Sequence, residues 1–155
     1  MAEQRLLHGW GRTSPVRSTV LAVDADQVAA TLRDAGPRGV VARGLGRSYG
    51  DAAQNAGGAV LLPIHGETRM DAEDVVVPAG TSLHDLMRYL LPRGRFLPVT
   101  PGTRYVTVGG AIACDVHGKS HHVAGTFGRH VVSLDLVTAD GSTRTIGPVR
   151  RLAKK

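Results

Sequence analysis

The amino-acid sequence predicts one α+β domain. Early in its 155 residues, short runs of β-branched and apolar residues alternate with a helical pattern, and a hairpin signal follows late. The hydrophobic share of 42% and the charged share of 21% are ordinary for a globular domain. Glycine is the outlier, because its 20 residues cluster in a few segments. Such clusters indicate loops in which the backbone must approach something closely.

The first half of the chain predicts strands separated by one helix and one long loop. Asp24 or Asp26 caps the helix, and Gly36-Pro37 ends it. The loop is too polar and too rich in glycine for a helix. The expected order is strand 18–23, a helix to residue 35, strand 39–43, the glycine-rich loop 44–58 and strand 59–62.

The second half predicts two helices and a closing hairpin. Ser82 and Asp85 have the spacing of a capping box, and Pro92 ends the helix that follows. Thr107 can cap a short glycine-rich helix. The other expected elements are a turn-like segment 63–74, strands 75–77 and 96–99, and strand 131–138, the longest, which a turn at residues 140–141 joins to strand 142–146.

The charge does not indicate a nucleic-acid-binding protein. The net charge is +6 and the isoelectric point is about 10.2. Arginine and lysine are nevertheless scattered, apart from a cluster at residues 150–155, and no basic stripe alternates with aromatic residues. A basic surface also suits an anionic small ligand or an anionic lipid surface.

The single cysteine, Cys114, excludes an internal disulfide and fits a reducing compartment, so a cytoplasmic location is expected. The N-terminus has no apolar signal region, and no stretch is long and apolar enough to span a bilayer. Membrane contact is therefore expected to be peripheral at most.

The segment from Arg43 to Asp51 follows a predicted strand, as a phosphate loop should. A Rossmann fingerprint needs a glycine where this loop has Tyr49, and a helix where it continues as a polar loop, so that fold is excluded. What remains is a run of closely spaced amides flanked by two arginines and Ser48. Such a run either binds phosphate oxygens or forms an ordinary glycine-rich turn.

The second glycine-rich segment runs from Pro101 to Lys119. If Thr107 caps a helix that begins at Val108, the free N–H groups of its first turn face outward and favour an anion. Gly109 and Gly110 would let a bulky ligand lie against the backbone. The alternative is close helix packing, which small residues also serve.

Three other patterns in this region are weaker. Gly118-Lys119-Ser120 resembles the end of a Walker loop, but Ala113 stands where the first glycine should be. His117, His121 and His122 lack a nearby carboxylate–histidine pattern, so no metal site is expected. Cys114 is more consistent with a buried small thiol than with a nucleophile.

Together the two segments, Ala-Arg-Gly-Leu-Gly-Arg-Ser-Tyr-Gly-Asp and Pro-Gly-Thr-Arg-Tyr-Val-Thr-Val-Gly-Gly-Ala-Ile-Ala-Cys-Asp-Val-His-Gly-Lys, resemble the PCMH-type FAD-binding domain of the vanillyl-alcohol-oxidase superfamily. Within it they are most similar to the decaprenylphosphoryl-ribose 2′-oxidases of arabinan cell-wall synthesis. The resemblance implies two small α+β subdomains, the second incomplete. It also implies dissociable FAD, because covalent members often have histidine where this sequence has Arg47.

The resemblance assigns residues to the cofactor and to the substrate side. Tyr49, His117, Lys119 and Trp10 match positions near the flavin ring or the sugar pocket, with no catalytic residue assigned for certain. The residues implied to bind FAD are Ala42, Arg43, Gly44, Leu45, Gly46, Arg47, Ser48, Tyr49, Gly50, Asp51, Ala52, Gly102, Thr107, Val108, Gly109, Gly110, Cys114, Asp115, Val116 and His117.

The implied activity is oxidation of a sugar hydroxyl, with hydride passing to the flavin. Family members continue into further flavin-binding chain and a substrate domain, so residues 1–146 are expected to be an incomplete FAD-binding domain and 147–155 a disordered basic tail. A separate substrate-domain chain and an NAD-dependent reductase are the expected partners. The alternatives are an aldonolactone or alditol oxidase and a non-catalytic FAD-binding domain.

Overall fold

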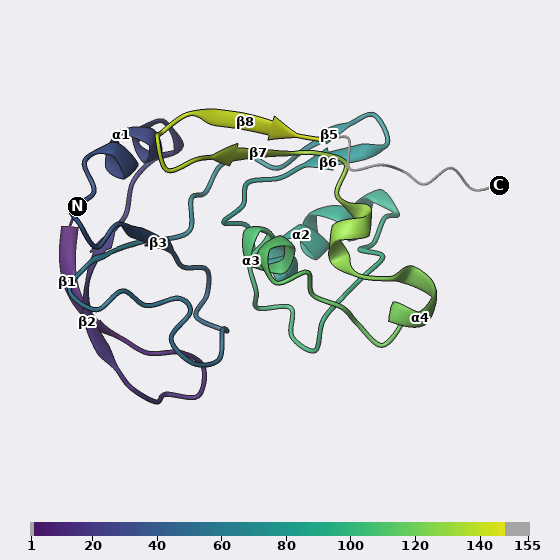
Figure 1. The fold of residues 1–155 in the computed structure, drawn as a ribbon. Helices are drawn as coiled ribbons and strands as arrows, with labels where there is room; N and C mark the ends of the chain where they lie inside the picture. The colour runs from purple at the N-terminus through teal and green to yellow at the C-terminus, as the bar shows by residue number, and fades with distance from the viewer. Residues whose placement is uncertain (1, 148–155) are drawn as a thin grey trace.

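The computed structural model describes residues 2–147. They form two lobes bridged by a β-hairpin (Figure 1). Residues 2–62 form the sheet lobe, with a four-stranded sheet and helix α1. Residues 69–131 form the helix lobe, with helices α2, α3 and α4 and the small hairpin β5–β6. The α+β class predicted from the sequence is confirmed.

The sheet lobe has the strand order β1-β2-β4-β3. The strands are β1 (Ala2–Leu7), β2 (Val16–Leu21), β3 (Val40–Ala42) and β4 (Ala59–Leu61). β1 pairs antiparallel with β2, whereas β4 is parallel to both β2 and β3. The glycine loop 44–58 therefore makes the crossover from β3 to β4, a role that a helix usually has.

Helix α1 (Val28–Arg33) follows a 3-10 turn at Ala25–Gln27. Asp24 precedes this turn and donates its N–H to Gln27 Oε1 at 3.1 Å. Val28 is the buried residue of α1, and Val20 and Val60 of the sheet are buried as well. The apolar pattern of residues 28–35 thus reflects packing, as expected from its helical spacing.

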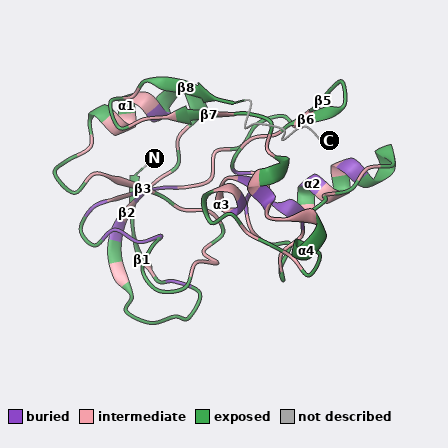
Figure 2. Ribbon diagram, turned by 45° about the vertical axis from the view of Figure 1, so that its right-hand side comes forward, coloured by how far each residue is buried: buried purple, intermediate pink, exposed green. Residues whose placement is uncertain are grey.

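The main hydrophobic core lies in the helix lobe, where α2 (Leu83–Leu90) supplies three of its seven buried residues (Figure 2). Ser82 caps α2, because its hydroxyl oxygen accepts the Asp85 N–H at 3.0 Å. The Asp85 carboxylate accepts the Ser82 hydroxyl at 2.6 Å in place of the N-cap amide of a full capping box. The core residues are Leu83, Leu86, Leu90, Val99, Val108, Ala111 and Phe127.

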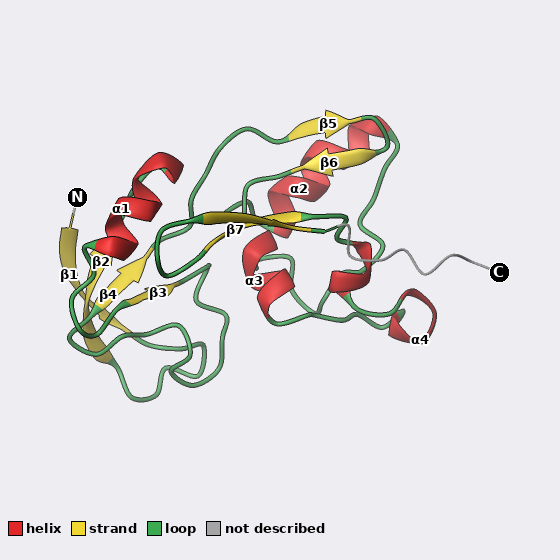
Figure 3. Ribbon diagram, turned by 45° about the horizontal axis from the view of Figure 1, so that its top comes forward, coloured by secondary structure: helices red, strands yellow, loops and turns green. Residues whose placement is uncertain are grey.

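The rest of the helix lobe consists of short elements (Figure 3). Helices α3 (Val108–Ala113) and α4 (His121–Ala124) are followed by a 3-10 turn at Phe127–His130. A 3-10 turn at Leu91–Arg93 ends α2. Strands β5 (Arg69–Asp71) and β6 (Asp74–Val76) pair antiparallel.

The bridging hairpin consists of β7 (Leu134–Val137) and β8 (Thr143–Ile146). It runs along one side of both lobes, from α1 to the β5–β6 hairpin (Figure 1). A Cβ on Gly141 at its turn would contact the Ala29 carbonyl and the Arg33 side chain, so the turn lies against α1. The turn predicted at residues 140–141 is confirmed.

Three expectations about elements were wrong, and one strand was not predicted. Residues 96–99 form no strand, the expected long strand 131–138 is shortened to β7, and the turn-like segment 63–74 contains β5. The polar start of the chain forms β1, one of the two longest described strands, at six residues. The basic tail predicted from residue 147 lies outside the described residues, apart from Gly147 itself.

Candidate functional site

The first glycine loop leaves its backbone N–H groups without internal acceptors. None of the amides from Gly44 to Ala52 donates a hydrogen bond to another described residue. Its carbonyl groups do accept: Ser48 O from the Trp10 N–H at 2.8 Å, and Leu45 O from Arg47 at 2.6 Å. Because unpaired amides seek an acceptor, this row of donors suits phosphate oxygens.

Glycine is needed in this loop for its backbone conformation. Gly46 and Gly50 have φ angles of 69° and 65°, in the left-handed region. A Cβ on Gly46 would also lie 2.6 Å from the guanidinium of Arg43. The spacing of glycines that excluded the Rossmann fold therefore follows from the turns of this loop and from its contact with Arg43.

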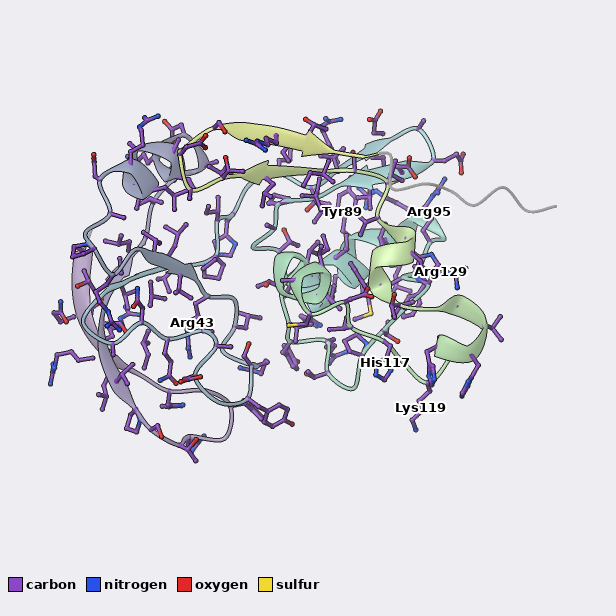
Figure 4. The ribbon with its side chains drawn as sticks, viewed as in Figure 1. Arg43, Tyr89, Arg95, His117, Lys119 and Arg129 are labelled. Atoms are coloured by element: carbon purple, nitrogen blue, oxygen red, sulfur yellow. The ribbon has the colours of Figure 1, made fainter. Side chains whose placement is uncertain are left out.

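Arg43, at the start of the loop, is half-buried beneath it (Figure 4). Its guanidinium donates to the Ala53 carbonyl and to the His8 carbonyl, each at 2.8 Å. No described carboxylate lies within ion-pair distance of it. Burial lowers the pKa of Arg43 from its ordinary value, because the charged form loses solvation.

The segment that follows β1 braces the loop from outside. A Cβ on Gly9 would overlap the Gly50 carbonyl, so these backbones touch. The guanidinium of Arg47 lies 4.5 Å from the centre of the Trp10 ring, a cation–π contact. Residues 9 and 10 thus contact the loop at Ser48 and Gly50, about 40 residues along the chain.

The two glycine-rich segments meet at Thr107. A Cβ on Gly44 would lie 2.6 Å from Thr107 Oγ1. Thr107 is buried and caps α3, because its hydroxyl accepts the Gly110 N–H at 3.1 Å. The cap predicted from the sequence is confirmed, and it stands where the sheet lobe contacts the helix lobe.

The expectation that free N–H groups of α3 face outward was wrong. The Val108 N–H donates to Thr81 O at 2.9 Å and the Gly109 N–H to Ala79 O at 2.8 Å, while Thr107 satisfies Gly110. These amides are therefore used inside the protein. The row of amides without an acceptor among the described residues belongs to the first loop instead.

Gly109 serves the close packing that was the alternative reading of this glycine pair. A Cβ on it would lie 3.1 Å from the Cβ of Ala79. Gly80 in turn lies against Ile64, whose carbonyl a Cβ on Gly80 would overlap. Sequence reasoning assigned no role to residues 79–81 and missed that Ala79 and Thr81 accept the amides of α3; the Pro-Ala-Gly composition of residues 78–80 was the available signal.

Residues 114–117 turn away from the end of α3. Cys114 is exposed, so the expected buried thiol was wrong. Asp115 has a left-handed φ of 41°, and its Oδ1 accepts the Gly128 N–H at 2.9 Å. His117 forms a β-bridge with Thr126. The pattern Cys114, Asp115, His117 thus includes a carboxylate that holds the 3-10 turn after α4.

A cluster of imidazole rings follows. The ring centres of His117 and His121 are 5.2 Å apart, and those of His121 and His122 are 3.9 Å apart. Gly118 is required here, because a Cβ would overlap the Thr100 carbonyl. No group of three or more His, Cys, Asp or Glu side chains among the described residues could hold a metal ion.

The substrate-side candidates fall on both lobes. Trp10, at 50% exposure, lies on the sheet lobe beside the first loop, and Tyr49, at 78% exposure, is part of that loop. His117 and Lys119 lie on the helix lobe (Figure 4). Gly102 is exposed, and a Cβ on it would meet nothing within 4 Å.

Two hollows of the surface lie away from this site. These shallow hollows, of about 270 and about 490 Å³, flank α1 near Val23 and Gln27 and include no residue of either glycine-rich segment. We therefore base the site on the row of unbonded amides rather than on cavity size.

Within residues 2–147, no helix is long and apolar enough to cross a membrane.

Comparison with known proteins agrees with this geometry. A family model described as "FAD binding domain" matches residues 16–147. A decaprenylphosphoryl-beta-D-ribose oxidase of Mycolicibacterium smegmatis is 53% identical over 154 residues, which is 92% of this chain and 33% of that protein. A Streptomyces coelicolor protein, described as an uncharacterized protein in the mprA 5′ region, is 49% identical over 65 residues, which is 42% of this chain and 18% of that protein.

These matches confirm the resemblance drawn from the two glycine-rich segments. The chain spans about a third of the length of the Mycolicibacterium smegmatis relative. The family model covers both the first loop and α3, the two parts of the structure that meet at Gly44 and Thr107. This chain therefore belongs to the FAD binding domain family, and its cofactor is FAD.

Proposed function

We propose that the first glycine loop holds the diphosphate of FAD. One observation carries this proposal: the amides from Gly44 to Ala52 donate to no described residue, above an arginine that has no carboxylate partner. A diphosphate offers several acceptor oxygens to these amides and a negative charge to the Arg43 guanidinium, which has no described carboxylate within ion-pair distance. The diphosphate therefore fits the first loop. The first turn of α3 contributes packing rather than hydrogen-bond donors.

The other predicted site residues keep their roles as proposals. Thr107 to Gly110 place the helix lobe against the loop, and Cys114 to His117 continue from the end of α3. Gly102, which is exposed, would line the flavin with them. We assign Trp10, Tyr49, His117 and Lys119 to the substrate side.

The reaction proposed for the whole protein is oxidation of a sugar hydroxyl, as in a decaprenylphosphoryl-ribose oxidase. Bound FAD supplies a two-electron acceptor for such a reaction. The chain's own residues bind and orient the cofactor. Four further points stay predictions. They are the domain limits 1–146, the partner chains, the cytoplasmic location and the peripheral membrane contact.

Titration of the purified 155-residue chain with FAD tests this proposal. Bound FAD should raise the melting temperature, with stabilisation of about 2.7 kcal/mol at a hundredfold excess over Kd. Gly46→Ala should weaken FAD binding at least tenfold. The matched control is Gly57→Ala, because Gly57 has a similar φ of 68° but open space around its Cβ position.

If Gly57→Ala weakens FAD binding as much as Gly46→Ala, the loss comes from general backbone strain and the loop assignment fails. Absence of any FAD-dependent rise in the melting temperature would contradict the proposal directly. For the substrate, oxygen consumption with an aldonolactone or an alditol, in place of a polyprenyl-phosphoryl ribose, would point to the neighbouring class of oxidase.

A further inference from the structure

The side chain of Arg43 joins three segments of the sheet lobe that are distant in sequence through its hydrogen bonds. Its Nη1 donates to Ala53 O, and its Nη2 donates to His8 O. Ala53 lies ten residues beyond Arg43, directly after the row of unbonded amides 44–52, and His8 lies 35 residues before Arg43, just after β1. One planar guanidinium therefore joins the loop's entry, its exit and the bracing segment.

The same side chain contacts the loop at its middle. Gly46 approaches the guanidinium so closely that a Cβ there would lie 2.6 Å from Nη2. The carbonyl groups of Ser48 and Ala53 are taken by Trp10 and Arg43. The loop is thus held through its carbonyl groups and side chains, and its amides are left unbonded.

The charge of Arg43 has no partner in the described part of the chain. Neutral carbonyl groups satisfy its N–H groups without neutralising it, and burial disfavours the charged form. Such a group destabilises the empty loop slightly and is stabilised when an anion binds nearby. This is an arrangement that positions a loop for an anion.

We propose that Arg43 is a positioning residue, which holds the loop's amides in the arrangement that receives the FAD diphosphate by bonding His8 O and Ala53 O together. This inference rests on the proposed function. It differs from the role implied by the family resemblance, in which residues 42–52 simply contact the cofactor.

Arg43→Lys separates the two roles. Lysine keeps the positive charge, but its single ammonium group does not reproduce the planar fork that reaches both carbonyl groups. A residue that acts only by its charge on the diphosphate would be rescued by lysine. A positioning residue would not be, and the loop would loosen even without FAD.

Two measurements on the full chain test this. The first is the FAD Kd, expected to rise at least tenfold in Arg43→Lys. The second is the backbone ¹⁵N order parameters of residues 44–52 without FAD, expected to fall from about 0.85 to below about 0.6. Arg17→Lys, an exposed arginine on β2, is the control and should leave both unchanged. Arg43→Gln, a neutral donor, serves if the lysine variant does not fold.

The outcomes are distinct. A raised Kd with unchanged order parameters would show a direct ligand and overturn the proposal, as would unchanged values of both. A loosened loop with FAD binding within twofold of the parent would also overturn it. If the parent chain binds no FAD yet the loop loosens in Arg43→Lys, the proposed function fails and the positioning role of Arg43 stands.

Discussion

At the scale of single residues, the glycines of this chain have different roles. Some occupy left-handed turns, as Gly46 does, and others allow two backbones to touch, as Gly9 does against Gly50. Gly11 has neither role, since nothing lies within 4 Å of its Cβ position. Gly9 and Gly11 flank Trp10 and so form a matched pair.

Gly9→Ala should weaken FAD binding at least tenfold and destabilise the fold by about 1–3 kcal/mol, because the new methyl group displaces the Gly50 carbonyl and the loop with it. Gly11→Ala should change the free energy of unfolding by no more than about 0.5 kcal/mol. Chemical denaturation and FAD titration of both variants measure this. Equal effects of the two substitutions would contradict the claim that Gly9 holds the loop in place through its contact with Gly50.

The sequence predicted a glycine-rich loop at residues 44–50 but not the contacts that hold it in place. Glycine spacing indicates where the backbone turns, and it removed the Rossmann alternative. The bonds of Arg43 to His8 and Ala53 join segments far apart in the chain. Two carbonyl groups of unremarkable residues give no sequence signal, so these contacts could be found only in the folded structure.

At the scale of elements, helices with caps were predicted well and isolated strands were not. Ser82 and Thr107 mark helix starts by local chemistry, which the sequence contains in full. Residues 96–99 have strand-like composition but pair with no described strand. β1 shows the reverse, because its polar residues become a strand by pairing with β2 along six residues.

The β7–β8 turn gives a prediction about pH. The side chains of Thr138 and Ser142 and the Ser142 N–H donate hydrogen bonds to Asp140, which lowers its pKa from 3.8 to about 2. A lowered pKa in the folded state means that the turn is fully stabilised above about pH 4. This stabilisation is lost as the pH falls toward 2.

The amide chemical shift of Ser142, followed by NMR between pH 5 and about 2, should report this titration. Asp140→Asn keeps an acceptor oxygen but cannot titrate, so its Ser142 amide should show no such transition. A transition of the same size and midpoint in Asp140→Asn would mean that another group controls the turn.

At the scale of the whole molecule, the lobes meet where the two glycine-rich segments touch. Gly44 of the sheet lobe has room only for a hydrogen beside Thr107 Oγ1 of the helix lobe. Membership of the family could be predicted from sequence, because both segments are motifs in the right order. Their contact could not, since it depends on how the lobes pack.

Gly44→Ala should separate this contact by forcing Thr107 away, at a cost of about 1–3 kcal/mol in the free energy of unfolding. FAD binding should weaken with it, because the loop and α3 shift relative to each other. Gly36→Ala, with open space at its Cβ position, is the control. Denaturant midpoints and FAD titration check both, and an unaffected Gly44→Ala would show that the lobes adjust freely.

The brace formed by Gly9 and Trp10 bears on where this domain begins. The family model starts at residue 16, after both residues. A protein cut at that boundary would keep every amide of the glycine loop while losing the His8 carbonyl, the Trp10 N–H and the ring beneath Arg47. The contacts that hold the first glycine loop in this structure thus reach back to residue 8, before the range that the family model matches.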